Sequence, residues 1–256
     1  MPQTEISTLT YNLPKLVNEN GGQTRIFIPK YGNINERRHQ LHEVIRLSGI
    51  NLIIDDMDMP LIIKVASIPK ERMQVYFIDS EDYFKGRSGY SKDENNKLYK
   101  DNDERSIFFS KGVIETIKKL NWAPDLIHVH GWIASLLPLY MKYYYKDDPI
   151  FDGTKVVVSL YENALDGKMD KNFVKKIKYD EIDDSNLTLL NESTYENLYK
   201  IALKYADGAI LTSVLKNKFS DVLKNTDIPV LECPHSSDDY KEKYSEFYNS
   251  FLLNED

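Results

Sequence analysis

One stretch in the middle of the chain constrains the fold most, because it places an apolar strand, a glycine turn and an apolar helix in direct succession. Residues 126–129 are an apolar run with the length of a buried strand. Gly131 permits a tight turn, and residues 134–145 then have the composition of an apolar helix. A strand that turns directly into a helix has its connecting residues at the carboxyl edge of a parallel sheet, where open α/β folds bind ligands. We therefore expect His130, Gly131 and Trp132 to line a crevice at that edge.

The periodicity of the remaining chain predicts an α/β domain on a parallel sheet, because strands and helices alternate throughout the second half. Strands are expected at residues 24–28, 61–68, 73–78, 126–129, 155–160, 208–212 and 228–231. Helices are expected at residues 6–19, 35–47, 103–120, 134–145, 173–177, 195–205, 214–223 and 236–253. The lack of repeats and of a Pro/Gly/Ser linker favours a single domain over residues 1–256.

The first half of the chain departs from simple alternation. Pro14 lies inside the first helical pattern and predicts a kink or an early stop. Residues 69–72 are expected to join the two strands at residues 61–68 and 73–78 as a β-hairpin. Residues 52–54 can pair beside this hairpin. Residues 88–102 have the composition of a long charged loop. The chain also begins with a helix, whereas a doubly wound domain usually begins with a strand. Either a preceding strand is missing or the sheet is built without it.

Composition limits the partners and the compartment. The 256 residues carry a formal net charge of −7, which argues against nucleic-acid binding, since phosphate contacts need a clustered excess of Lys and Arg. No apolar segment approaches the roughly 18 residues of a membrane span, and the N-terminus lacks the features of a signal peptide. The single cysteine, Cys233, excludes an internal disulfide and fits a reducing compartment. The expected location is the cytoplasm, with neither nucleic acid nor membrane as a partner.

Two pairs of histidines raise the question of a metal site. His128 and His130 are two residues apart on a strand, so they point to the same face if the strand continues. A zinc site would need a further ligand, and no local cysteine or carboxylate suggests one, so a buried or hydrogen-bonded pair near a substrate is favoured. His39 and His42 are three apart on an expected helix, but the arginines around them favour a charged face in water. No metal ligand is expected.

Other signals for catalysis are weak. Cys233 and His235 lie two residues apart near the last strand, but a nucleophile pair needs an orienting acid. The adjacent acidic pairs are so numerous that none is informative, and they resemble loop or helix-cap residues. The sequence contains no glycine-rich dinucleotide loop, no Walker loop and no Gly-x-Ser-x-Gly elbow. We therefore expect no cofactor and assign no catalytic residue.

Several motifs in register resemble the N-terminal half of bacterial glycogen synthases and plant starch synthases, which form glycosyltransferase family 5. The motifs are Asp101-Asn102-Asp103-Glu104-Arg105 with Phe108-Phe109, Pro124-Asp125-Leu126-Ile127-His128-Val129-His130-Gly131-Trp132, Leu13-Pro14-Lys15, Pro29-Lys30-Tyr31, Val157-Val158-Ser159-Leu160-Tyr161 and Tyr205-Ala206-Asp207-Gly208. They follow in the family's order from about Thr4 to Thr212. Several motifs in register are far more specific than any one of them.

The resemblance implies a GT-B fold, in which two Rossmann-like domains face each other across a cleft. This chain would be the N-terminal domain, a parallel sheet flanked by helices with a β-hairpin insertion, and the second GT-B domain would be absent. The family transfers glucose from ADP-glucose to the non-reducing end of an α-1,4-glucan, with retention of configuration and without a metal. The implied partners are an α-glucan or maltooligosaccharide and ADP-glucose.

The resemblance implies substrate-binding positions at His130, Gly131, Trp132, Ile133, Tyr161, Thr4 and Glu5. The sequence keeps the family's residue at His130 and Trp132 and departs from it at others. The family's Lys-Thr-Gly-Gly loop falls on Pro2-Gln3-Thr4-Glu5, so a lysine and two glycines are replaced, and Glu5 would repel a phosphate. The family's His-Asp-Trp-His becomes His130-Gly131-Trp132-Ile133, where a contact through the main-chain carbonyl of Ile133 can survive. Its Ile-His-Asn becomes Leu160-Tyr161-Glu162.

Two functions follow from this pattern. The first is a glycogen or starch synthase-type glycosyltransferase domain, which does not transfer glucose alone and is completed by a separate chain that supplies the second domain. The second is a non-catalytic glucan-binding or regulatory module that kept the fold and lost the chemistry. Stacking of a sugar on Trp132 and Tyr161 fits both. A bare α/β domain with a filled crevice is a third reading. The aromatic helix at residues 240–251 packs on its own domain or serves in dimerisation.

Overall fold

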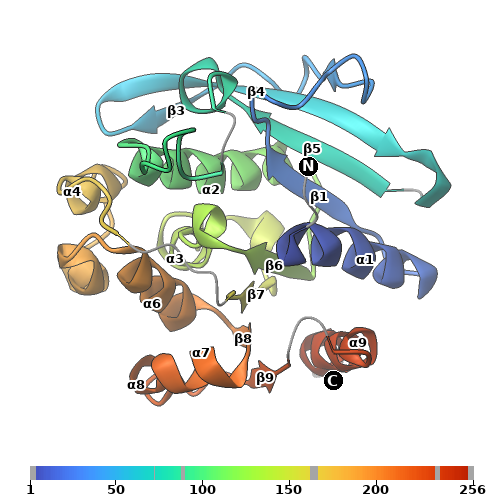
Figure 1. Cartoon of the computed structure of the whole chain (residues 1–256), viewed down its shortest axis with the longest axis vertical. Helices are drawn as coiled ribbons and strands as arrows, with labels where there is room; N and C mark the ends of the chain where they lie inside the picture. The colour runs from blue at the N-terminus through green and yellow to red at the C-terminus, as the bar shows by residue number, and fades with distance from the viewer. Residues whose placement is uncertain (1–3, 72, 88–89, 162–166, 234–236, 253–256) are drawn as a thin grey trace.

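The computed structural model describes residues 4–71, 73–87, 90–161, 167–233 and 237–252. It has an α/β architecture in which helices pack on two hydrogen-bonded sheets (Figure 1). The strands are β1 (Arg25–Pro29), β2 (His42–Glu43), β3 (Ile50–Ile54), β4 (Met57–Ile68), β5 (Met73–Asp79), β6 (Leu126–His130), β7 (Lys155–Ser159), β8 (Gly208–Leu211) and β9 (Val230–Glu232). The helices are α1 (Glu5–Glu19), α2 (Asn102–Lys119), α3 (Leu137–Tyr143), α4 (Phe173–Lys178), α5 (Asp184–Leu187), α6 (Tyr195–Tyr205), α7 (Ser213–Lys218), α8 (Ser220–Leu223) and α9 (Tyr240–Leu252).

The sheet of the C-terminal half is parallel throughout, in the order β6-β7-β8-β9. In its register Leu126 lies opposite Lys155, and Val157 lies opposite Gly208. β7 and β8 are buried apart from the half-buried Lys155. Burial on both faces explains why these parallel strands are nearly continuous apolar runs in the sequence. The parallel sheet predicted for this half is confirmed.

The sheet of the N-terminal half combines a parallel pair with a hairpin. β1 runs parallel to β5, whereas β4 runs antiparallel to β5, β3 and β2. The predicted β-hairpin insertion is therefore confirmed. β4 begins earlier than expected, at Met57, because its first part pairs with β3. This pairing also confirms the expectation that residues 52–54 lie beside the hairpin.

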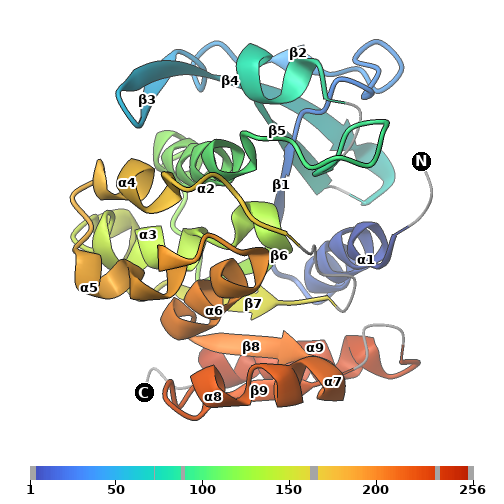
Figure 2. The same ribbon diagram turned by 60° about the vertical axis from the view of Figure 1, so that its left-hand side comes forward.

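Helices cover both faces of the C-terminal sheet. α1 and α9 pack together on one face (Figures 1 and 2), where Leu9, Leu13 and Tyr244 form an apolar cluster with Val157. Val158, which points the other way because side chains alternate along a strand, belongs to the larger core that contains residues of α2, α3 and α6. Figure 1 shows α2 beneath the hairpin sheet, so this core joins the two sheets.

Residues 35–47 do not form the expected helix. They form turns and the short strand β2, in which His42 lies opposite Val65 of β4. Gln40 has a φ of 52°, a left-handed conformation that a helix cannot contain. Pairing with a neighbouring strand has overridden the local sequence preference here.

Two helix boundaries also differ from expectation. α1 runs through Pro14 to Glu19 rather than stopping early. Packing holds the helix on both sides of the proline, because Leu9 and Leu13 before it are buried and Leu16 and Val17 after it are half-buried. The helix expected at residues 134–145 is divided into a 3-10 turn at Trp132–Ala134 and the helix α3, with Pro138 in its first turn, a position that proline favours.

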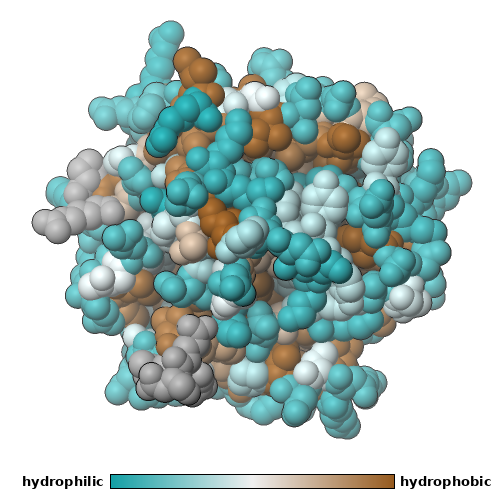
Figure 3. All heavy atoms as spheres, turned by 180° about the vertical axis from the view of Figure 1, so that it is seen from behind, coloured by the Kyte–Doolittle hydropathy of each residue, from teal (hydrophilic) through white to brown (hydrophobic). Residues whose placement is uncertain are grey.

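The face opposite to that of Figure 1 has a mixed surface. Figure 3 shows hydrophobic side chains there in separate patches among hydrophilic ones. Scattered apolar side chains of this kind are ordinary on protein surfaces. Within the described ranges, no helix has both the length and the apolar character needed to cross a membrane.

Candidate functional site

The candidate site lies where β6 and β7 end and the first turn of α1 arrives. β6 ends at His130 and β7 at Ser159, and parallel strands present their carboxyl ends to the same edge of the sheet. The first turn of α1 reaches this edge, since a Cβ atom placed on Gly131 would lie 3.3 Å from Cδ1 of Ile6. The edge therefore brings together three segments that are far apart in the sequence.

His130 and Tyr161 are joined directly at this edge. Nδ1 of His130 lies 2.6 Å from the hydroxyl oxygen of Tyr161, and Tyr161 is only 6% exposed. Burial raises the pKa of the Tyr161 hydroxyl well above its usual value, and the nearby Tyr244 and Glu5 raise it further. The hydroxyl is therefore neutral at physiological pH and shares a hydrogen bond with the imidazole.

His128 and His130 point to the same face, as their spacing predicted. Their ring centroids are 3.9 Å apart. The two ring nitrogens of His128 are both engaged by hydroxyl groups, Nδ1 by Tyr248 of α9 at 2.6 Å and Nε2 by Ser159 at 2.7 Å. The arrangement is a hydrogen-bonded polar cluster under α9, which agrees with the reading preferred over a metal pair. In the part of the chain that the structure describes, no group of three or more His, Cys, Asp or Glu side chains could hold a metal ion.

Position 131 requires glycine, because the turn has no room for a side chain there. Its φ is +72°, a conformation that favours glycine. A Cβ atom at this position would lie 2.6 Å from the hydroxyl oxygen of Tyr90 and would also press on Ile6. The turn after β6 is therefore close-fitting on both sides, and glycine stands here for a geometric reason.

Trp132 and Ile133 are buried rather than exposed in a crevice, at 1% and 3% exposure. The Trp132 ring makes edge contacts with Tyr90 at 5.5 Å and Tyr195 at 5.7 Å between centroids. The backbone of Ile133 forms a hydrogen bond with the Tyr90 hydroxyl. The expectation that Trp132 lines a crevice and stacks on a sugar is wrong for this arrangement, because protein side chains cover the ring. Trp132 instead packs against Tyr90 and Tyr195 and so helps to hold the turn after β6 in place.

Thr4 and Glu5 begin α1 next to this edge. The Thr4 hydroxyl accepts from the Ser7 backbone N–H at 3.1 Å, and the Thr4 backbone N–H donates to the Ser7 hydroxyl at 2.9 Å, a reciprocal cap. Glu5 is exposed and lies near enough to raise the pKa of Tyr161. This helix start therefore contributes a capping hydroxyl and a negative charge to the site. Pro2 and Gln3 lie outside the described residues, as does Glu162.

Sequence reasoning missed Arg105, which is buried beneath the edge. Its guanidinium donates to Asn102 Oδ1 at 2.6 Å and to the Tyr90 carbonyl at 3.2 Å, and burial lowers its pKa. Aromatic rings surround it at 5.2–5.8 Å, namely those of Tyr31, Phe84, Tyr99 and Trp132. Arginine favours such contacts with ring faces. The acidic motif that ends in Arg105 marks this position in the sequence, but the motif alone does not indicate that the guanidinium is buried.

The weaker candidates do not come together. His39 and His42 share no helix face, so the expected helix is wrong there, but both are exposed, as expected of a charged face in water. Cys233 is buried, and His235 lies outside the described residues. The acidic pair at Asp183 and Asp184 begins a short helix, as expected of cap residues.

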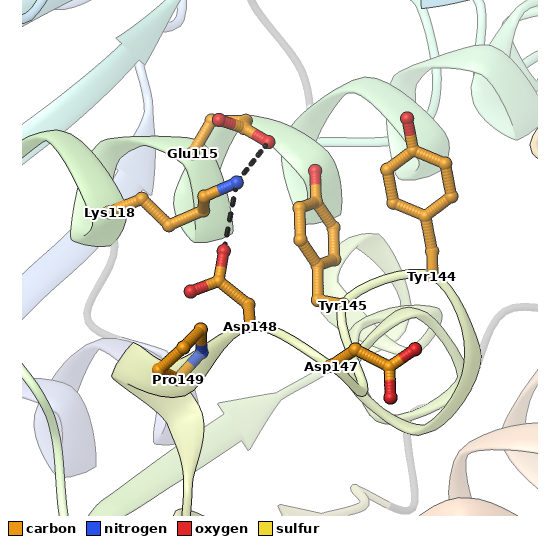
Figure 4. A pocket seen from close by; sticks show the side chains of 7 residues that line it. All are labelled: Glu115, Lys118, Tyr144, Tyr145, Asp147, Asp148 and Pro149. Carbon is orange, nitrogen blue, oxygen red and sulfur yellow. Dashed lines mark hydrogen bonds and ion pairs between the residues drawn. The ribbon is translucent and has the colours of Figure 1, made fainter.

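Two surface pockets lie away from this edge. The larger, of about 460 Å³, is shown in Figure 4 and is lined by Glu115, Lys118, Tyr144, Tyr145, Asp147, Asp148 and Pro149. Lys118 crosses it and pairs with Glu115 at 3.5 Å and Asp148 at 3.0 Å. The second, of about 370 Å³, lies between the β3–β4 hairpin and the start of α2 and is mainly acidic. Neither pocket contains a residue of the candidate site.

The parallel sheet with helices on both faces defines a class of fold, that of Rossmann-like α/β domains of the GT-B-like type. The structure is similar to the catalytic domain of starch synthase IV from Arabidopsis thaliana bound to ADP and acarbose, with a TM-score of 0.69. The similarity covers 93% of this chain and 50% of that one, at 16% sequence identity, so it concerns the fold.

The starch synthase catalytic domain family matches residues 4–215, and the chain belongs to this family. Among its relatives, the glycogen synthase of Chlorobium luteolum is 36% identical over 220 residues, which are 85% of this chain and 43% of that protein. The glycogen synthase of Chlorobaculum tepidum is 37% identical over 202 residues, 79% of this chain and 41% of that protein. The chain thus spans about two-fifths of the length of these curated relatives.

Proposed function

We propose that this chain is the N-terminal domain of a glycogen or starch synthase-type glucosyltransferase, folded as a single domain over residues 1–256. The proposed reaction is the transfer of glucose from ADP-glucose to an α-1,4-glucan. The observation that carries the proposal is the His130–Tyr161 pair at the adjoining ends of β6 and β7, in a chain whose family match covers that edge.

In this proposal the carboxyl edge handles the acceptor glucan. His130, Tyr161 and the backbone of Gly131 and Ile133 supply hydrogen-bonding groups, which sugar hydroxyls need. Trp132 does not contact the glucan in this proposal. It is buried and keeps the turn after β6 in place. The proposal needs no cofactor and no metal, since positioning and electrostatic stabilisation can carry a group transfer of this kind.

The charge at the edge argues that the chain does not transfer glucose alone. A departing diphosphate needs positive groups or backbone N–H groups aimed at it. The first turn of α1 instead carries Glu5, and its N-terminal Thr4 is engaged in capping. We propose that a second Rossmann-like domain provides the groups that hold the nucleotide and closes the cleft against water.

The decisive experiment measures binding and chemistry separately on the purified chain. Titration calorimetry with maltoheptaose should show binding, and Tyr161→Phe should weaken it. Incubation with ADP-glucose and glycogen should give no chain extension. Measurable extension by the chain alone would contradict the need for a second domain, and no binding of maltoheptaose would contradict the glucan role.

A second candidate is a non-catalytic glucan-binding or regulatory module. It is favoured by the negative charge of Glu5 beside the edge, at the helix N-terminus where an anion would otherwise be bound. Titration with ADP-glucose separates the two candidates, since glucan binding without any affinity for ADP-glucose favours the module. For both candidates we propose the cytoplasm, because a chain with one cysteine can form no internal disulfide.

A further inference from the structure

The hairpin sheet has an outer edge that is formed by β2 and β3. Among the described strands, β2 and β3 each pair only with β4. The chain between them stays on the same side of β4, since the Val44 N–H donates to the Ile63 carbonyl and the Gly49 N–H donates to the Leu61 carbonyl. An open edge of this kind is a place where a second chain can associate. The turn at residues 45–47 interrupts the edge, so side chains rather than a continuous ladder would make the contact.

One end of this edge carries unbalanced positive charge. Arg37 and Arg38 are exposed in the turns before β2, and we call them the arginine end. Neither arginine forms an ion pair with any residue that the structure describes. The acid that precedes them, Glu36, is already paired with Lys30 and Lys64. Two free guanidinium groups therefore lie side by side in a chain whose formal net charge is −7.

The other end of the edge is acidic and hollow. The turn from β3 into β4 carries Asp55, which is half-buried, and Asp56 and Asp58, which are exposed; we call these three the aspartate end. Together with Met57 they line the second pocket, of about 370 Å³. Of the three, Asp55 alone has a lysine within ion-pair distance among the described residues, Lys175 at 3.9 Å. A hollow with free carboxylates and an apolar side chain suits a guanidinium group on its aliphatic stem.

The two ends are placed symmetrically along β4. His42 of β2 lies opposite Val65, and Ile54 of β3 lies opposite Met57. Leu61 is midway between these two positions of β4, about 14 Å from each at the rise of an extended strand. Figure 2 shows β3 and its turn into β4 at the left of the upper sheet and the segment between β1 and β2 at the right. A twofold axis at the level of Leu61 would therefore place the arginine end of one copy against the aspartate end of another, twice over.

Large apolar side chains are exposed between the charged ends. Ile45 is 84% exposed, Ile53 is 44% exposed and Met57 is 61% exposed. The same twofold axis brings the turn that carries Ile45 in one copy toward Ile53 in the other. Apolar side chains in the middle with charged groups around them are the usual composition of a protein–protein interface.

We propose that this edge binds the same edge of a second copy of the chain, in a twofold dimer in which Arg37 and Arg38 of each copy reach the acidic pocket of the other. The contact is closed by symmetry, because each copy offers one arginine end and one aspartate end. β2 and β3 contribute no residue to the candidate site at β6 and β7, so the dimer does not depend on what that site binds.

The test measures the oligomeric state of the full chain by sedimentation velocity, from about 1 μM to about 300 μM. The unaltered chain should change from monomer to dimer across this range, and the dimer should weaken at high salt, which screens exposed charges. The variant Arg37→Glu with Arg38→Glu should remain monomeric, and so should Asp56→Lys with Asp58→Lys, because like charges then meet at both contacts. All four positions are exposed, so the circular dichroism spectra should be unchanged.

Recombining the charges gives the sharpest outcome. An equal mixture of the two variants should form a heterodimer, and the chain with all four substitutions should dimerise again, because opposite charges then meet at both contacts. The matched control is Asp221→Lys with Lys224→Glu at exposed positions of α8 and its end, which should dimerise like the unaltered chain. An unaltered chain that is monomeric throughout would overturn the proposal. So would charge-reversed variants that dimerise unchanged, or a mixture that stays monomeric.

Discussion

The hydroxyl of Tyr161 lies 2.6 Å from Nδ1 of His130, so the ends of two neighbouring strands are tied by a side-chain hydrogen bond. In the ladder, His130 lies opposite Ser159, and Tyr161 comes two residues later. Tyr161 therefore reaches back across the edge to the imidazole and sets its orientation. A ring held in this way is preorganised, and preorganisation would lower the cost of binding the glucan proposed above.

Replacing Tyr161 with phenylalanine should leave the fold intact and weaken maltoheptaose binding. The lost hydrogen bond should cost about 1 kcal/mol of unfolding free energy, measured by urea denaturation. Binding is measured by calorimetry. The matched control is Tyr179→Phe, since Tyr179 is an exposed tyrosine, and it should change neither quantity. Unchanged binding in Tyr161→Phe would remove the pair from the proposed glucan site.

Trp132 should behave as a structural residue. In a Trp122→Phe background its fluorescence should be shielded from acrylamide and should not be quenched by maltoheptaose, since Tyr90 and Tyr195 cover the ring. Trp132→Ala should destabilise the fold by about 3–5 kcal/mol, as is typical for a buried large aromatic residue. Strong quenching by the sugar would show that the ring becomes accessible to ligand, contrary to this reading.

Reversing the charge at the start of α1 should change the affinity for ADP-glucose. Glu5→Lys replaces a group that repels phosphate with one that attracts it, at a helix N-terminus near Tyr161. We expect a several-fold gain in ADP-glucose affinity, measured by calorimetry, that shrinks at high salt. Glu19→Lys, at the other end of the same helix, is the control. Equal affinities for the two variants would show that no diphosphate comes near Glu5.

The ion-pair cluster around Glu36 should make stability depend on acid pH. Glu36 pairs with Lys30 at 2.7 Å and Lys64 at 2.8 Å, and the hydrogen bonds from these two lysines hold the Glu36 pKa below its usual 4.5. A carboxyl group whose pKa is lower in the folded than in the unfolded chain stabilises the fold at any pH above its pKa in the unfolded chain. This stability is lost as the pH falls through the pKa in the folded chain.

The pH dependence is measured as the urea midpoint below about pH 4.5. The midpoint of Glu36→Gln should fall less steeply there than that of the unaltered chain. Glu43→Gln, at an exposed neighbouring position, serves as the control. Identical slopes for the unaltered chain and Glu36→Gln would show that the cluster contributes nothing to the acid response.

The strands of the second half could be predicted because a strand that is buried on both faces selects an apolar side chain at each of its positions. β7 and β8 need apolar side chains on both faces, so their sequence reads as a continuous run whatever lies next to them. The glycine turn at Gly131 was also visible, since only glycine readily adopts its conformation. The hairpin of β4 and β5 was predictable from two β-rich runs and a short connection.

The remaining features depend on contacts between distant segments. The burial of Trp132 results from Tyr90 and Tyr195, which come from a loop and a later helix, and no local pattern specifies their meeting. Residues 35–47 have a polar pattern compatible with a helix, but β2 pairs with β4 instead. The burial of Arg105 among aromatic rings is equally non-local. The periodicity of a sequence indicates which face of a helix or strand is buried, but it does not indicate which distant residues pack on that face.

The placement of α1 and α9 on one face of the C-terminal sheet, with the core around α2 and α3 on the other, limits how anything large can reach His130. Both broad sides are closed by helices, so an incoming macromolecule must come along the strand axis and meet the sheet end-on. A long polysaccharide would consequently cross the tips of the strands instead of lying along them, and mutations on the outer surfaces of α1 and α9 should leave its entry unaffected.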